Sequence, residues 1–189
     1  MRKLVQIAGL VSSATFLAAC GGGDGDGSTT PEASTPVTNP QPTAFSCPDN
    51  YRKISLGANS VPNANLSLVT DDNIATLTVK TPQTGLKDVT ICLGTPNPLP
   101  TGVKADYAYE VKTNGDYAHL LNPQLKVAFT LPSTMYANPI LETVQSTANG
   151  VTYTVARNDV STVNGTNASI TADVPAAGLY VVRLVPLKP

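Results

Sequence analysis

The chain has no tryptophan, a single histidine and few charged residues, and these shortages narrow its possible functions. Charged residues make up 13% of the sequence, whereas an average soluble domain has about 25%. The 12 basic and 13 acidic residues nearly cancel, and they are scattered singly. Nucleic-acid binding needs a clustered basic surface, which this pattern does not supply. No nucleic acid is therefore expected as a partner.

Catalytic residues are equally scarce. A hydrolase of the Ser-His-acid type would have to use His119, the only histidine, and no Gly-x-Ser-x-Gly elbow accompanies it. A lone histidine near a turn is more often a surface residue than a general base. The sequence therefore predicts a protein that is not an enzyme and needs no cofactor or metal, with a hydrolase using His119 as the less favoured alternative.

No apolar run is long enough to be expected to span a bilayer, but a shorter one lies at the start of the chain. Arg2 and Lys3 precede the apolar stretch 4–16, which ends in Leu17, Ala18, Ala19 and Cys20. This order is typical of a secretion signal. It resembles the signal peptide of bacterial lipoproteins, in which a lipobox ends at the cysteine.

The resemblance implies removal of residues 1–19 and lipidation of Cys20. Cys20 would carry a thioether-linked diacylglycerol and a further acyl chain, such as palmitate, on its amine. The bilayer is then a partner of the protein, and Gly21 after the cysteine, in place of aspartate, implies the outer membrane in the enteric members of this family. In the alternative, an ordinary secretory signal, Cys20 would be a spare thiol.

Residues 20–44 are rich in Gly, Ser, Thr and Pro and have almost no large apolar side chain. Such a segment cannot bury enough surface to offset its ordering entropy, so a disordered linker is predicted. Asp24 and Asp26 resemble a fragment of a calcium loop, but the further ligands that such a loop needs do not follow. A solvated spacer is the preferred interpretation.

Residues 45–189 are enough for one domain with a core. Apolar and polar residues alternate in short runs, which is typical of half-buried strands. The predicted inward residues are Ala75, Leu77, Val79, Val89, Ile91, Leu93, Leu125, Val127, Phe129, Leu131, Ile170, Ala172 and Val174. Two Asn-Gly pairs, at 114–115 and 149–150, each predict a tight hairpin between neighbouring strands. The predicted fold is all-β, a single sandwich of about eight to ten strands in two antiparallel sheets.

Lipidation of Cys20 would leave Cys47 and Cys92 as an even pair. In an oxidising compartment such as the periplasm these two cysteines are expected to form a disulfide. Cys92 alternates with Ile91 and Leu93, so its side chain should lie on the face opposite theirs. The disulfide is then expected to attach the segment around Cys47, which precedes the strands, to the outer face of a sheet.

The order of motifs also resembles the ZU-type β-sandwich, a domain of ankyrins, tight-junction scaffolds, netrin receptors and exported bacterial proteins. The motifs that carry the resemblance are Ile74–Pro82, Val89–Ile91, Tyr109–Val111, Asn122–Pro132, Leu141–Val155 and Gly178–Val182. The chain departs from the family in two ways, since it has no tryptophan and has Pro175–Gly178 where some members carry a self-cleaving His-Phe-Ser triplet. Self-cleavage is therefore not expected, and an unrelated immunoglobulin-like sandwich would give a similar pattern.

These observations favour a tethered, non-catalytic sandwich that serves as a protein-interaction or structural module of the cell envelope, in the periplasm or on the cell surface. The alternative is a calcium- or glycan-binding module. Calcium ligands could come from 71–73 or 158–159, although turn chemistry explains both clusters. A sugar platform would use tyrosines: Tyr107, Tyr109 and Tyr153 are predicted to be buried, whereas Tyr117 and Tyr136 are predicted to be freer.

Overall fold

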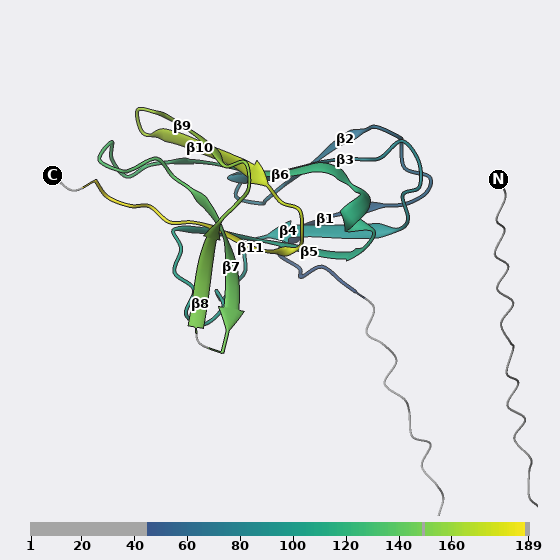
Figure 1. The fold of residues 1–189 in the computed structure, drawn as a ribbon, viewed down its shortest axis with the longest axis horizontal. Coiled ribbons are helices and arrows are strands. Elements are labelled where there is room, and N and C mark those ends of the chain that lie inside the picture. Colours follow the sequence, from purple (N-terminus) through teal and green to yellow (C-terminus); the bar gives the residue numbers. More distant parts are fainter. Residues whose placement is uncertain (1–44, 149, 188–189) are drawn as a thin grey trace, which may run out of the picture. The chain divides into compact units, whose positions relative to one another are not determined.

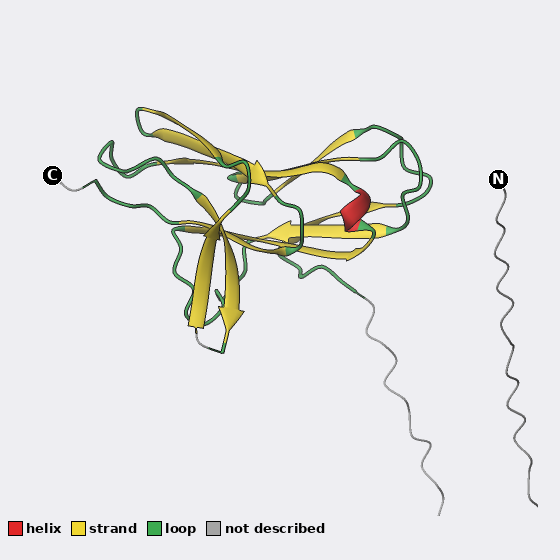
Figure 2. Cartoon of the chain, in the orientation of Figure 1, coloured by secondary structure: helices red, strands yellow, loops and turns green. Residues whose placement is uncertain are grey.

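The computed structural model describes residues 45–148 and 150–187. Eleven strands form two antiparallel sheets that pack face to face (Figure 1). Figure 2 shows that strands and loops make up nearly all of this region, with one 3-10 turn, η1 (Tyr117–His119). The predicted all-β two-sheet sandwich is confirmed, and it has one strand more than the upper end of the expected range.

The predicted signal peptide, Cys20 and the linker 20–44 lie outside the described residues. Within the part of the chain that the structure describes, no helix has the length and apolar character needed to cross a membrane.

The two sheets differ in size and in their edges. The six-stranded sheet runs in the order β1 (Tyr51–Leu56), β4 (Val89–Gly94), β5 (Tyr107–Gly115), β11 (Gly178–Val182), β7 (Leu141–Thr147) and β8 (Gly150–Val155). The five-stranded sheet runs in the order β2 (Asn65–Val69), β3 (Ala75–Lys80), β6 (Leu121–Thr130), β10 (Asn167–Asp173) and β9 (Val160–Asn164). The edge strands are therefore β1 and β8 in one sheet and β2 and β9 in the other.

The core lies between the sheets and follows the predicted alternation. All thirteen predicted inward residues are buried: Ala75, Leu77, Val79, Val89, Ile91, Leu93, Leu125, Val127, Phe129, Leu131, Ile170, Ala172 and Val174. Tyr109 and Tyr180 add aromatic bulk from neighbouring strands β5 and β11. Burial of this apolar surface is the main stabilising contribution to the sandwich, at about 25 cal/mol per Å² removed from water.

The predicted disulfide is present, and it joins the chain before β1 to β4. The Cα atoms of Cys47 and Cys92 are 5.6 Å apart. Ile91 and Leu93 belong to the core between the sheets, so the intervening Cys92 projects from the outer face, as expected. The bond thus fixes the entry of the chain against the outside of the six-stranded sheet.

The Asn-Gly predictions had different outcomes. The pair at 149–150 was expected to make a hairpin, and β7 and β8 do pair with each other, with Asn149 itself outside the described residues. The hairpin predicted at 114–115 was wrong, because β5 ends at Gly115 and the chain then crosses to the other sheet through η1. Gly115 has a φ of 74°, and a Cβ atom there would lie 1.9 Å from the Asp88 carbonyl oxygen. Close backbone approach, and not a two-residue turn, explains this glycine.

The strands that the alternation did not indicate are short or lie at edges. Both β2 and β9 have five residues, and neither has a fully buried position. A strand at an edge packs few side chains into the core, so its sequence carries little of the alternating signal.

A polar contact links the two sheets at the β2–β3 turn. The Tyr109 hydroxyl, on β5, donates a hydrogen bond to Asp72 Oδ2 over 3.0 Å. Asp72 Oδ1 accepts hydrogen bonds from the Thr70 hydroxyl (2.5 Å) and the Ile74 N–H (2.9 Å). Burial raises the pKa of Asp72, but these hydrogen bonds more than compensate and hold it below its usual value. The carboxylate therefore organises the turn and ties it to the opposite sheet.

Replacing Asp72 with asparagine is expected to lower the free energy of unfolding at pH 7 by about 1 kcal/mol, since charge-assisted hydrogen bonds become neutral ones. Because the folded-state pKa of Asp72 is lowered, its contribution is present above the unfolded-state pKa and is lost as the pH falls through the folded-state value. Urea unfolding of both proteins should thus give curves that differ at pH 7 and converge as the pH falls through the folded-state pKa of Asp72. A difference that does not change with pH would contradict this role of the carboxylate.

Candidate functional site: an open strand edge and its crevice

His119 lies at the end of η1, and its side chain is 67% exposed. Its Nδ1 atom contacts Asp116 Oδ1, while Asp116 Oδ2 accepts a hydrogen bond from the Lys87 N–H over 3.0 Å. That backbone hydrogen bond, together with His119, lowers the pKa of the Asp116 carboxyl. Asp116 is the partner that the structure gives His119, and no serine, threonine or cysteine in the described region hydrogen-bonds to the ring. The geometry thus offers this histidine no nucleophile to activate.

None of the seven tyrosines is exposed in the described structure. Tyr107 stacks on Phe129 with ring centroids 4.4 Å apart, Tyr109 is buried, and Tyr136 and Tyr153 are half-buried. The prediction that Tyr117 is freer was wrong, because its ring is only 5% exposed and its hydroxyl donates to the Val174 carbonyl over 2.9 Å. The 3-10 turn directs this ring into the core, which raises the pKa of Tyr117 by burial.

The acidic clusters are occupied by turn contacts. Asp71 pairs with Arg52, and Asp72 accepts the three hydrogen bonds described above. Asn158 has a φ of 53° and donates to Asp173, while Asp159 Oδ2 accepts from the Leu141 N–H over 3.4 Å. Among the described residues, no group of three or more histidine, cysteine, aspartate or glutamate side chains is arranged to hold a metal ion. Turn hydrogen bonds and the contacts to Arg52 and Tyr109 account for Asp71 and Asp72. Asp159 Oδ1, in contrast, is buried with no hydrogen-bond partner among the described residues, and burial raises the pKa of this carboxyl.

The β7–β8 hairpin carries an open strand edge. In Figure 1 this hairpin points away from the five-stranded sheet. β8 pairs with β7 on one side and has no strand on the other, whereas β1, at the opposite edge of the sheet, lies against β2. The unpaired N–H and C=O groups of an edge strand are a template for another extended chain.

The register identifies which backbone groups face outward. The Ala156 N–H donates to the Leu141 carbonyl over 2.8 Å, so this pair is hydrogen-bonded across the hairpin. Hydrogen-bonded and non-hydrogen-bonded pairs alternate in an antiparallel ladder, and the next pair is Val155 with Glu142. The N–H and C=O of Val155 therefore point to the open edge, as do those of Tyr153 and Val151.

A crevice of about 290 Å³ lies against one face of this hairpin. One wall is the hairpin face that carries Thr143, Gln145 and Thr154, and the other is the segment 173–180. The second wall has small side chains at 175–178, which keep the crevice open. A strand added to β8 would present alternate side chains to such a crevice.

An ion pair holds the hairpin on the sandwich. Glu142 is buried and accepts two hydrogen bonds from Arg183, both over 2.6 Å. The Arg183 guanidinium lies 4.1 Å from the centre of the Tyr153 ring, and the Tyr153 hydroxyl accepts from the Lys104 N–H over 2.8 Å. These contacts join β7 and β8 to the residue that follows β11 and to the loop before β5.

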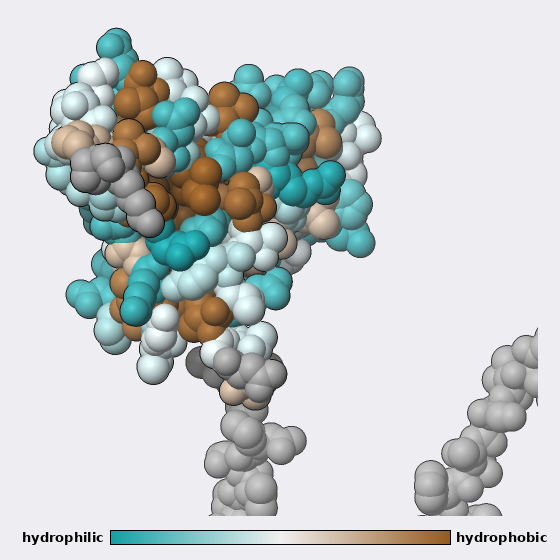
Figure 3. Space-filling view, turned by 60° about the vertical axis from the view of Figure 1, so that its left-hand side comes forward, coloured by the Kyte–Doolittle hydropathy of each residue, from teal (hydrophilic) through white to brown (hydrophobic). Residues whose placement is uncertain are grey.

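Exposed apolar side chains also gather near the end of the chain. The segments 135–137 and 185–187 hydrogen-bond to each other, and Met135, Val185 and Leu187 are each more than half exposed. Figure 3 shows hydrophobic side chains in a band across this side of the molecule. Contiguous apolar surface of this kind is typical of protein-interaction sites.

Sequence reasoning did not find the open edge. The alternation of Val151, Tyr153 and Val155 does predict a strand, but nothing in it indicates that the strand has a neighbour on one side only. The sequence feature that comes nearest to indicating this edge is a set of four threonines, at 143, 147, 152 and 154. Polar side chains on both strands are typical of a strand pair that has no second sheet packed over that face.

No protein-family model matches this chain, and neither does any curated protein or solved structure.

Proposed function

We propose that the protein is an envelope lipoprotein, anchored through an acylated Cys20, whose β-sandwich is a non-catalytic protein-interaction module. The observation that carries the proposal is the open edge of β8, in a hairpin that has a crevice against one face. Its partner would be an extended segment of another envelope protein, because only a polypeptide backbone matches a row of unpaired N–H and C=O groups. The lipobox sequence and Gly21 favour the outer membrane as the site of anchoring.

The apolar band gives the proposal independent support. Met135, Val185 and Leu187 would lose exposed hydrophobic surface on association, which contributes about 25 cal/mol per Å². The formal net charge of the chain is only −1, so electrostatic steering is expected to contribute little to the rate of association.

A proline at Val155 tests the edge directly. Val155→Pro removes an N–H that points outward and leaves the β7–β8 hydrogen bonds in place. Chemical cross-linking in intact cells, followed by mass spectrometry, is expected to capture one stoichiometric envelope protein with the wild type and at least tenfold less of it with Val155→Pro.

Val155→Ala is the matched control, because it shortens the same side chain and keeps the N–H. Capture by this variant should equal that of the wild type. Equal capture by both variants would contradict a role for the β8 edge, and recovery of only the free monomer from every strain would contradict the interaction function itself.

A further inference from the structure

The outer face of the five-stranded sheet is a second candidate surface, on the opposite sheet from β8. Cross-strand neighbours on this face form rows of small polar side chains. One row holds Asn164, Asn167 and Thr130, and the next holds Thr162, Ser169 and Ala128. These residues come from β9, β10 and β6, so the rows run across three adjacent strands.

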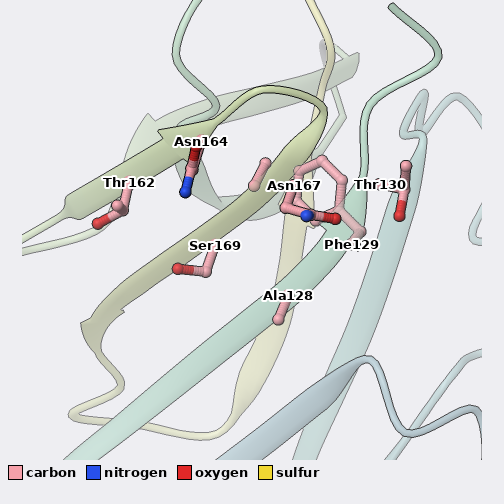
Figure 4. Close-up of a pocket in the computed structure, with 8 residues that line it drawn as sticks. Ala128, Phe129, Thr130, Thr162, Asn164, Asn167 and Ser169 are labelled. Carbon is pink, nitrogen blue, oxygen red and sulfur yellow. The ribbon is translucent and has the colours of Figure 1, made fainter.

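The small side chains leave a hollow. Its volume is about 420 Å³, within the range of about 300–1,000 Å³ common for small-molecule sites. Figure 4 shows the polar side chains of the three strands around it, together with the Phe129 ring. Ala128 contributes an apolar side chain, and two asparagines, two threonines and one serine contribute hydrogen-bonding groups, whereas the side chains of Phe129 and Ala168 belong to the core on the other face of the sheet.

The polar side chains of the hollow are not used within the protein. Elsewhere, asparagine and threonine side chains hold turns and strands, as Asn114 does for the Thr90 N–H and Thr81 for the Val61 carbonyl. In the described structure, none of the five polar side chains of the hollow makes a side-chain hydrogen bond. Amide and hydroxyl groups that are collected in one hollow and not bonded internally are available to a ligand.

The lining also restricts the charge of that ligand. It contains no lysine, arginine, histidine, aspartate or glutamate. An ionic ligand would lose hydration there without gaining an opposite charge, whereas hydroxyl and amide groups of a ligand would find both donors and acceptors.

We infer that this hollow binds a neutral glycan strand, and that N-acetylhexosamine units fit it best. Asparagine amides can donate to and accept from an acetamido group, the hydroxyls can bond to sugar hydroxyls, and the acetamido methyl can pack on the Ala128 methyl group. This site differs from the tyrosine platform that the sequence analysis gives as part of the alternative function, and it does not depend on the partner proposed for β8.

Titration calorimetry of the purified domain-containing chain with the β-1,4-linked hexamer of N-acetylglucosamine tests the inference. The wild type should bind in the millimolar range or more tightly, and the cellulose hexamer, which lacks acetamido groups, at least fivefold more weakly. Asn164→Ala combined with Asn167→Ala should reduce the affinity at least tenfold, since both amides are lost. Asn65→Ala, on β2 of the same sheet, is the matched control and should leave binding unchanged.

A substitution that fills the hollow with a larger side chain provides a second test of glycan binding, and this test does not depend on the asparagines. Ser169→Gln places a longer side chain in the centre and should abolish binding, while thermal melting confirms that the variant folds. Absence of binding by the wild type at millimolar glycan would overturn the inference, as would equal affinity for the cellulose hexamer or undiminished binding by Ser169→Gln. None of these results bears on the cross-linking test of the β8 edge.

Discussion

Replacing Cys20 with serine is expected to move nearly all of the protein from the membrane fraction to the soluble fraction of fractionated cells. The thioether to diacylglycerol requires the cysteine sulfur, so serine cannot be lipidated in this way. Each buried methylene contributes about 0.8 kcal/mol of membrane affinity, and stable anchoring takes more than one acyl chain. Loss of all chains should therefore change the distribution from almost complete membrane association to almost none.

Cys47→Ser is the matched control, because it removes a cysteine that the structure places in the disulfide. This variant should remain in the membrane fraction. The intact mass of the wild-type mature protein should also show a chain that starts at Cys20 and carries two or three acyl groups. Wild-type protein with a free Cys20 thiol, or Cys20→Ser protein that stays with the membrane, would contradict the lipoprotein proposal.

Removal of the disulfide should have the largest effect on stability. Cys47 and Cys92 are 45 residues apart in sequence, and a bond that closes a loop of this length contributes up to about 4 kcal/mol on the chain-entropy model. Cys92 is fully buried, so its loss also affects packing on the outer face of β4. The double variant Cys47→Ala, Cys92→Ala is expected to lose about 2–4 kcal/mol of unfolding free energy.

Urea unfolding measures the loss of unfolding free energy in the double variant. Reduction of the disulfide in the wild type provides the control, because it breaks the same bond without a substitution. Wild-type protein in a strong thiol reductant should unfold at nearly the same urea concentration as the double variant, while the double variant should not respond to reductant. A loss of less than about 0.5 kcal/mol in the free energy of unfolding would show that the Cys47–Cys92 disulfide does not constrain the unfolded chain.

The alternating runs made the fold class predictable. Residues such as Leu77, Ile91, Val127 and Ile170 alternate with polar neighbours, and each is buried in the core. The position of Cys92 followed from the same period of two residues, because a strand directs successive side chains to opposite faces. Local sequence was therefore sufficient wherever a strand is packed on one face.

Features that depend on distant parts of the chain could not be predicted. Gly115 looked like a hairpin glycine, but its conformation is imposed by the Asp88 backbone against which it packs. Tyr117 looked like a loop residue, but η1 turns its ring toward the Val174 carbonyl. The β8 edge depends on the pairing of β11 with both β5 and β7, which leaves β8 outermost. No periodicity of a single strand reveals its place in the order of a sheet.

The most direct test of the central proposal is photo-cross-linking from the β8 edge of the lipidated protein in intact cells. A photoreactive amino acid at Thr154, which is exposed on β8, is compared with one at Lys53, which is exposed on β1 at the opposite edge of the same sheet. The proposal predicts that Thr154, and not Lys53, cross-links to one envelope protein, and that the product is lost when Cys20 is replaced with serine. The same products from both positions, or none from Thr154, would contradict it.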